Sequence, residues 1–280
     1  LGGGLDAALR QRLECTYVES ANLAAQYPDT TALDNLVDSD VTDIYPVGDN
    51  EAGLGDREFQ KTASVMKLVL DSPASTPYPY AGAGTITMGG YDYHGGGRST
   101  GEGRDFRAGR CMGACLEYAH RKGVPLMLYV CSDGSLSSNG VTEDTIAGRG
   151  KGMWTSDNQQ TAGAFFLVYN PAGRPQLMGG TPDEQAQPQQ LGYMRASGDV
   201  ETSSSPAANN VNQLVQMVML NYMALHGEQG NFAQLFTDNN LSQGLGTNSE
   251  VLDRYTAFQP IYTGDLDSPV ALGGGDAPPA

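Results

Sequence analysis

Long hydrophobic runs, metal-binding cysteine pairs and basic residues are all scarce in this chain of 280 residues. No stretch of about 18 apolar residues occurs, so no segment is expected to cross a membrane. The chain opens with Leu1-Gly-Gly-Gly and has neither an initiator methionine nor a signal peptide. It then runs into a helical pattern, so we expect it to be a mature or cleaved product.

Positive charge is scarce, because 16 lysines and arginines face 32 aspartates and glutamates, which gives a formal net charge of −16. This balance argues against binding to nucleic acid or to anionic lipid, whose phosphates need cationic patches. Eight of the 16 basic residues nevertheless fall between positions 98 and 151. They either bind a small anionic ligand or pair with acidic neighbours on a solvated helix. The candidate anion-binding residues are Arg98, Arg104, Arg149 and Lys151.

Only four cysteines are present, and none forms the CxxC spacing that zinc sites and redox motifs use. They are too few for a disulfide scaffold. Two interpretations stay open: all four are small buried side chains, or one pair forms a disulfide in an oxidising compartment. The four are Cys15, Cys111, Cys115 and Cys131.

Apolar residues at helical spacing predict four helices. The third is expected to end at Gly123, and the fourth, which has the most complete apolar stripe, should cover one face of a sheet. An insert over residues 171–206 is too poor in apolar residues to build a core of its own. The four predicted helices span residues 5–25, 57–70, 104–122 and 207–226.

Three short segments have the β-branched or continuous apolar content of buried strands. A helix separates the first two, and a strand, a helix and a strand at this spacing form a βαβ unit with parallel strands. We therefore predict an α/β fold with a mainly parallel sheet flanked by helices and long irregular loops. It should form a single domain over 1–280, with its core at about 57–237 and an irregular tail over 238–280. The predicted strands are residues 84–89, 125–131 and 164–169.

Polar residues follow or flank each predicted strand at one edge of the sheet, where open parallel sheets bind ligands. Asp92 and His94 follow the first strand, Asp133 follows the second, and Asp157 precedes the third. Carboxylates and imidazoles from neighbouring loops are the usual ligands of zinc, manganese or calcium, so we predict a divalent-metal site. Each residue also has a purely structural explanation, because Asp-Gly pairs and loop histidines are common in turns.

The order of these elements resembles a bacterial family, domain of unknown function 1501, of the alkaline phosphatase and sulfatase superfamily. Its members show a strand ending in Asp-Thr-His, a strand ending in Ser-Glu-Phe-Gly-Arg, and a Thr-Asp-His-Gly segment before another strand. The corresponding segments here are 91–94, 131–134 and 155–158, and the likeness covers about residues 57–237. The resemblance implies an alkaline-phosphatase-like fold and export by the twin-arginine route to the periplasm, the cell surface or the extracellular space.

The chain departs from the family pattern at three points. Tyr93 replaces the Thr, Asp133-Gly-Ser-Leu replaces Glu-Phe-Gly-Arg, and Asn158 replaces the second His. The superfamily holds two metals with Asp and His and attacks with a Ser, Thr or modified Cys on an earlier strand, and this chain has no clear earlier strand. A normal two-metal set cannot be assembled in the usual way from its three histidines, His94, His120 and His226.

These features lead to three functional hypotheses. The first is a structural, assembly or binding role, as a homo-oligomer or extracellular filament subunit with an eroded active site. The alternative is a metal-dependent phosphoester or sulfoester hydrolase, so whether the chain is an enzyme stays open. The third is calcium-stabilised adhesion, suggested by Asp38, Asp40 and Asp43, which also fit a solvated acidic loop.

Overall fold

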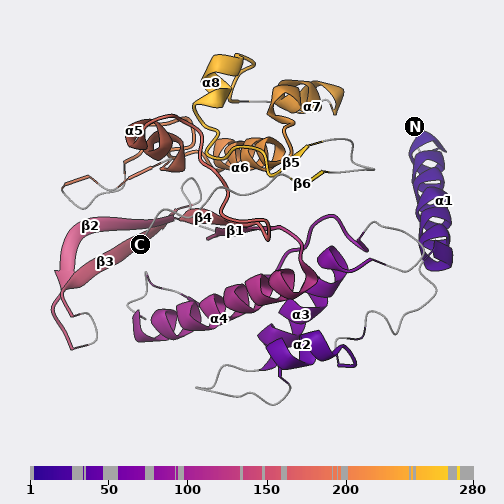
Figure 1. Ribbon diagram of the computed structural model, residues 1–280, viewed down its shortest axis with the longest axis horizontal. Helices are drawn as coiled ribbons and strands as arrows, with labels where there is room; N and C mark the ends of the chain where they lie inside the picture. The colour runs from indigo at the N-terminus through magenta and orange to yellow at the C-terminus, as the bar shows by residue number, and fades with distance from the viewer. Residues whose placement is uncertain are drawn as a thin grey trace. The chain divides into compact units, whose positions relative to one another are not determined.

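A computed structural model gives the arrangement of helices and strands in Figure 1. Its contacts divide the chain into two compact units. Unit 1 comprises Leu1–Met88 and Gly113–Lys122, and unit 2 comprises Gly89–Met112 and Gly123–Ala280. The single domain stays a prediction. The structure describes residues 3–26, 34, 36–46, 56–72, 79–91, 93, 98–132, 135–146, 149–158, 163–190, 192–193, 195–196, 201–239, 241, 244–263 and 270–271.

Unit 1 is built from helices. Asp38 caps the helix Ser39–Ile44, because its carboxylate accepts hydrogen bonds from the backbone N–H groups of Asp40 and Val41. The helix Arg98–Lys122 ends before Gly123, the residue at which the sequence predicts its end. The φ of Gly123 is 67°, the left-handed conformation that glycine often adopts after a helix. The helices are α1 (Gly3–Gln26), α2 (Ser39–Ile44), α3 (Asp56–Leu70) and the last part of α4 (Arg98–Lys122).

The core of unit 1 confirms the apolar stripe predicted for α3. Phe59, Ala63 and Met66 are buried, and the ring of Phe59 meets that of Tyr45 edge to face at 5.8 Å. Tyr118 of α4 is fully buried in the same unit. Helix α1 differs, because every side chain described on it is exposed, including the predicted stripe residue Tyr17.

Membrane-spanning helices are predicted to be absent, and the helices that the structure describes agree. None of them is both long and apolar enough to cross a bilayer. This finding covers the described residues alone.

Unit 2 contains two of the three predicted strands, β1 (Leu126–Cys131) and β4 (Ala164–Tyr169). They pair antiparallel, with Leu128 opposite Leu167, where the sequence analysis expects parallel strands. The third predicted strand, residues 84–89, belongs to no helix or strand. Without it no βαβ crossover exists among the described residues, and parallel pairing needs such a crossover. The wider α/β assignment stays a prediction.

A second antiparallel pair joins β2 (Ser135–Glu143) and β3 (Lys151–Asn158). The register shifts twice along this hairpin, between Ser137 and Ser138 and between Ser138 and Thr142. Such bulges bend and twist a strand pair. The sequence does not indicate a strand here, because serine and glycine interrupt the apolar alternation of β2. A short third pair joins β5 (Tyr262–Thr263) and β6 (Val270–Ala271).

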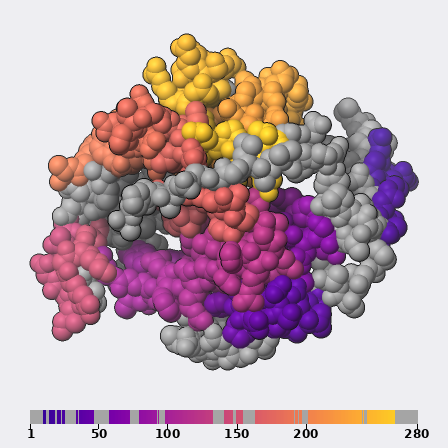
Figure 2. Space-filling model, viewed as in Figure 1, coloured from indigo at the N-terminus to yellow at the C-terminus, as the bar shows by residue number. Residues whose placement is uncertain are grey.

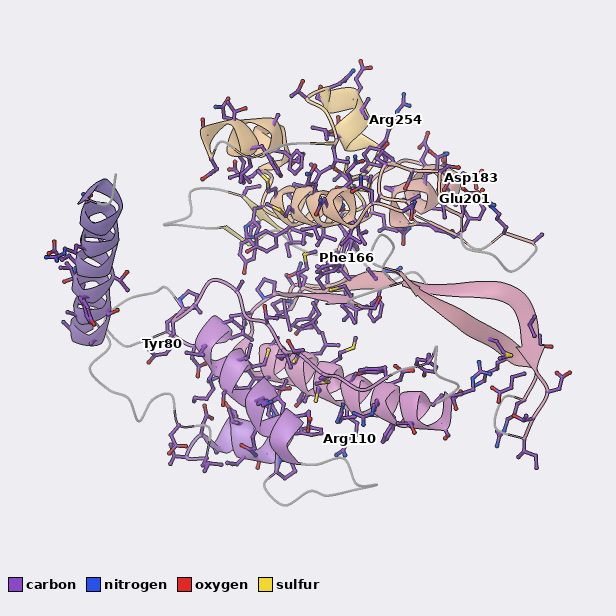
Figure 3. All side chains as sticks on the ribbon, turned by 180° about the vertical axis from the view of Figure 1, so that it is seen from behind. Tyr80, Arg110, Phe166, Asp183, Glu201 and Arg254 are labelled. Atoms are coloured by element: carbon purple, nitrogen blue, oxygen red, sulfur yellow. The ribbon has the colours of Figure 1, made fainter. Side chains whose placement is uncertain are left out.

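The predicted late helix is confirmed as α6 (Val211–Leu225), and it organises the core of unit 2. One side of α6 packs with α7 (Phe232–Asp238) and α8 (Ser249–Asp253), which lie at one end of the unit in Figure 2. Its Leu214 and Val218 line a hollow of about 180 Å³ together with β4. There the ring of Phe166, labelled in Figure 3, meets Phe258 edge to face at 6.0 Å. The buried cluster comprises Met217, Leu220, Phe232, Phe236, Leu245 and Leu252.

Hydrogen bonds join the described parts of the polar insert over 171–206, which has few apolar residues. Helix α5 (Pro182–Ala186) begins with a capping box between Thr181 and Glu184. Further along, the carboxylate of Glu201 accepts from Arg195 at 3.0 and 3.1 Å and from the backbone N–H of Ser203 at 2.8 Å. The hydrogen bonds from Arg195 and from the Ser203 N–H lower the pKa of Glu201 to about 2.

The order around Glu201 should therefore depend on pH. Because the folded pKa lies below the ordinary value of 4.5, its contribution is complete above that value and is lost as the pH falls toward about 2. The amide chemical shifts of Thr202 and Ser203 should titrate with a midpoint near 2, and Glu201→Gln should abolish the transition. A midpoint near 4.5 would contradict the arrangement.

Candidate functional site

The candidate site begins where residues 89–93 are attached to the first turns of α4, within unit 2. The Tyr91 hydroxyl donates to the carbonyl of Arg104 at 3.3 Å, and the Arg104 guanidinium donates to the carbonyl of Gly89 at 2.7 Å. The Tyr93 hydroxyl donates to the carboxylate of Asp105. Burial and this carboxylate raise the pKa of Tyr93, so it stays protonated. Three hydrogen bonds thus hold Gly89, Tyr91 and Tyr93 against α4.

Two glycines allow this close approach. A Cβ on Gly90 would lie 2.7 Å from the Arg104 guanidinium, and its φ of 82° is left-handed. A Cβ on Gly101 would lie 2.5 to 2.8 Å from three ring atoms of Tyr93. Glycine is otherwise unfavourable inside a helix, so the Tyr93 ring that lies on Gly101 explains why glycine occurs at this position of α4.

Gly101→Ala should therefore destabilise unit 2, by about 1 to 3 kcal/mol from overpacking. The control is Gly103→Ala on the same helix, where no atom lies within 4 Å of the added Cβ. That change should stabilise by up to about 1 kcal/mol, because alanine favours the helix. Thermal unfolding of both variants measures the difference. Equal stabilisation by both alanines would show that Tyr93 does not pack on Gly101.

Three of the four predicted metal ligands, Asp92, His94 and Asp133, lie outside the described residues. Asp157 lies in β3, where its backbone is opposite Leu136 of β2. Among the described residues, no three His, Cys, Asp or Glu side chains come together as a metal ion requires. The divalent-metal site at these four residues therefore stays a prediction.

The predicted anion-binding residues mostly contact acidic groups or backbone of unit 2 itself. Arg98 lies 3.4 Å from the Glu143 carboxylate and donates to the carbonyl of Gly152 at 2.9 Å. Lys151 lies 2.7 Å from Glu102. Arg104 is engaged with Gly89, as described above, and Arg149 occupies the turn before β3 with a φ of 49°. Of the two alternatives for the basic residues, pairing with acidic neighbours is therefore the one observed for Arg98 and Lys151.

Unit 1 holds a charged cluster that the sequence patterns do not indicate. The ammonium of Lys67, buried in α3, lies 2.6 Å from Asp38 and 3.4 Å from Asp71. Lys122 lies 3.1 Å from Asp71, whose carboxylate also accepts from the Tyr118 hydroxyl at 2.9 Å. The sequence carries one sign of a buried lysine, because Lys67 falls on the apolar face of α3 four residues after Ala63.

The acidic residues considered as calcium ligands belong to this cluster. Asp38 bonds Lys67 and caps α2, and Asp43 lies 3.3 Å from Arg121. Arg121 is also 3.8 Å from Asp40. Each of the three carboxylates therefore already faces a cation of unit 1, which favours a structural role over calcium binding.

None of the four cysteines forms a disulfide; Cys111 and Cys115 are buried, and Cys15 and Cys131 are exposed. No family model, curated protein or solved structure matches the chain. The resemblance to the alkaline phosphatase superfamily thus rests on the sequence motifs and stays a prediction.

Proposed function

We propose that the chain is an exported, self-associating protein that serves in assembly or binding, as a homo-oligomer or filament subunit, with an eroded alkaline-phosphatase-like site. The observation that carries this proposal is an exposed apolar sheet face in unit 2. Phe165 is 50% exposed and Leu167 is 38% exposed, although both lie in a strand.

The register of the strand pair explains this face. Phe165 and Leu167 point to the side of β4 opposite Phe166, and their cross-strand neighbours are Val130 and Leu128. Four apolar side chains therefore share one face. A two-stranded sheet is marginally stable by itself, and contiguous exposed apolar surface marks an interaction site.

The composition of the candidate site supports assembly over catalysis. Asn158 stands where the resembled family has a histidine, and the described residues before position 84 include no strand that could carry a nucleophile. Two of the cations available for an anionic ester, Arg98 and Lys151, already pair with Glu143 and Glu102. An anionic ligand would have to displace these carboxylates.

The test is the mass of the protein in solution, by light scattering, for the wild type and two variants. Phe165→Ser with Leu167→Ser should lower the mass of the oligomer. Ile146→Ser is the matched control, since Ile146 is 92% exposed between β2 and β3 and lies outside the sheet face. If the mass falls only for Ile146→Ser, or for neither variant, the sheet face does not take part in self-association.

A second candidate is a metal-dependent phosphoester or sulfoester hydrolase. The anchoring of Tyr91 and Tyr93 on α4 favours it, because a binding loop must be held in place. Asp92, His94, Asp133 and Asp157 would bind zinc, manganese or calcium. Elemental analysis of the purified protein should then find one of these metals, and Asp92→Asn should abolish turnover of an aryl phosphate or sulfate. A metal-free protein without such turnover would exclude this candidate.

A further inference from the structure

Residues 84–88 of unit 1 have the features of a β-strand that has no partner. Residues 83–91 run without helix, turn or bend. Along the segment, Thr85 and Thr87 are exposed while Ile86 and Met88 are half-buried, which is the alternation of a strand with one covered face. Gly84 lies against α3, since a Cβ there would overlap the Val65 side chain.

The backbone of this segment is unpaired within the described part of the chain. The nearest hydrogen bonds to the main chain are the Ala81 N–H to the Leu68 carbonyl on one side and the Arg104 guanidinium to the Gly89 carbonyl on the other. None of those between described residues involves the backbone of residues 84–88. A hollow of about 400 Å³ lies beside it, lined by Thr85, Ile86 and Thr87 and by Lys61, Ser64 and Val65 of α3. Open strand edges of this kind bind a further strand through main-chain hydrogen bonds.

The sequence of the segment points to a second copy of the same chain as the partner. Thr85-Ile86-Thr87 is symmetric about Ile86. In an antiparallel pair of two copies, Ile86 faces Ile86 and each Thr85 faces Thr87, and both kinds of cross-strand pair are favourable.

The charge distribution permits this partner at residues 84–88. The chain carries a net charge of −16, so two copies repel each other over most of their surfaces. No charged residue occurs between Asp71 and Asp92, whereas the α3 side of the hollow presents Lys61. Strand segments that are uncharged, β-branched and free of proline are the ones that associate most readily.

We propose that residues 84–88 pair antiparallel with the same residues of a second copy, about a two-fold axis at Ile86. This inference rests on the proposed self-association and names a surface for it. Cross-linking tests it in a background in which the exposed Cys15 and Cys131 are changed to serine. Ile86→Cys should give a disulfide-linked dimer on mild oxidation, because directly opposed residues have the separation that a disulfide needs.

Thr85→Cys is the matched control, since its expected neighbour is position 87 of the other copy. Alone it should cross-link at least about tenfold less than Ile86→Cys, because its Cβ atoms lie too far apart. A mixture of Thr85→Cys and Thr87→Cys proteins should restore the cross-link.

Light scattering separates the two proposals. One result is an oligomeric protein in which Ile86→Cys fails to cross-link, or cross-links no better than Thr85→Cys. That result would contradict pairing at residues 84–88 but not self-association. A monomeric protein overturns both.

Discussion

Asn221→Ala should lower the free energy of unfolding by about 3 kcal/mol, because it leaves buried backbone groups without partners. Asn221 of α6 is 1% exposed. Its amide donates to the carbonyls of Met217 at 2.9 Å and Tyr255 at 2.8 Å, and its oxygen accepts from the backbone N–H of Ala257 at 2.8 Å. One side chain thus joins α6 to the segment after α8.

Asn212→Ala is the control for this change, since Asn212 lies on the same helix and is exposed. Its stability should change by less than about 0.5 kcal/mol, as for most surface substitutions. Urea unfolding followed by circular dichroism measures both variants. A loss below about 1 kcal/mol for Asn221→Ala would show that the Ala257 N–H finds another partner.

Lys67→Met should destabilise unit 1 by about 2 to 3 kcal/mol, because removing one member of a buried ion pair leaves the other charge uncompensated. The Lys67 side chain is 5% exposed, and its carboxylate partners Asp38 and Asp71 are 17% exposed. Lys122 would still lie near both carboxylates, which keeps the loss below that of an isolated pair.

Lys122→Met tests whether the position of Lys67 matters. Lys122 is more exposed and lies 4.0 Å from Asp38, so its removal should cost at most about 1 kcal/mol. Chemical denaturation of the two variants should therefore give clearly different midpoints. Equal losses would mean that the cluster acts through net charge alone.

The same cluster makes unit 1 sensitive to acid. Burial raises the pKa of Asp38, but the hydrogen bond and charge of Lys67 outweigh it, so the pKa lies below its ordinary value. This contribution is complete above the ordinary value of 3.8 and is lost as the pH falls through the folded pKa. Lys67→Met should remove that part of the acid dependence.

Helices were the most predictable part of the fold. Apolar spacing located α3 and α6, and Gly123 marked the end of α4, because helical periodicity and a left-handed terminus are local properties. Strand direction was not predictable in this way. A continuous apolar run such as β4 does not say whether its neighbour is parallel, and the structure pairs it antiparallel with β1.

The contacts of the candidate site were less predictable than its sequence motif. The sequence shows Tyr93 where the resembled family has a threonine, but the bond of Tyr93 to Asp105 and its contact with Gly101 depend on how two segments meet. Lys67 had a weak signal, since a lysine within an apolar stripe needs a buried carboxylate partner. That partner, Asp38, is 29 residues away, so spacing alone could not identify it.

The central claim is that copies of this chain associate with each other. Sedimentation velocity of the wild-type protein over a wide concentration range tests it most directly. We predict a dimer or larger species that persists on dilution, because Phe165 and Leu167 are exposed and residues 84–88 are unpaired within the described part of the chain. A single monomeric species at every concentration would contradict the account.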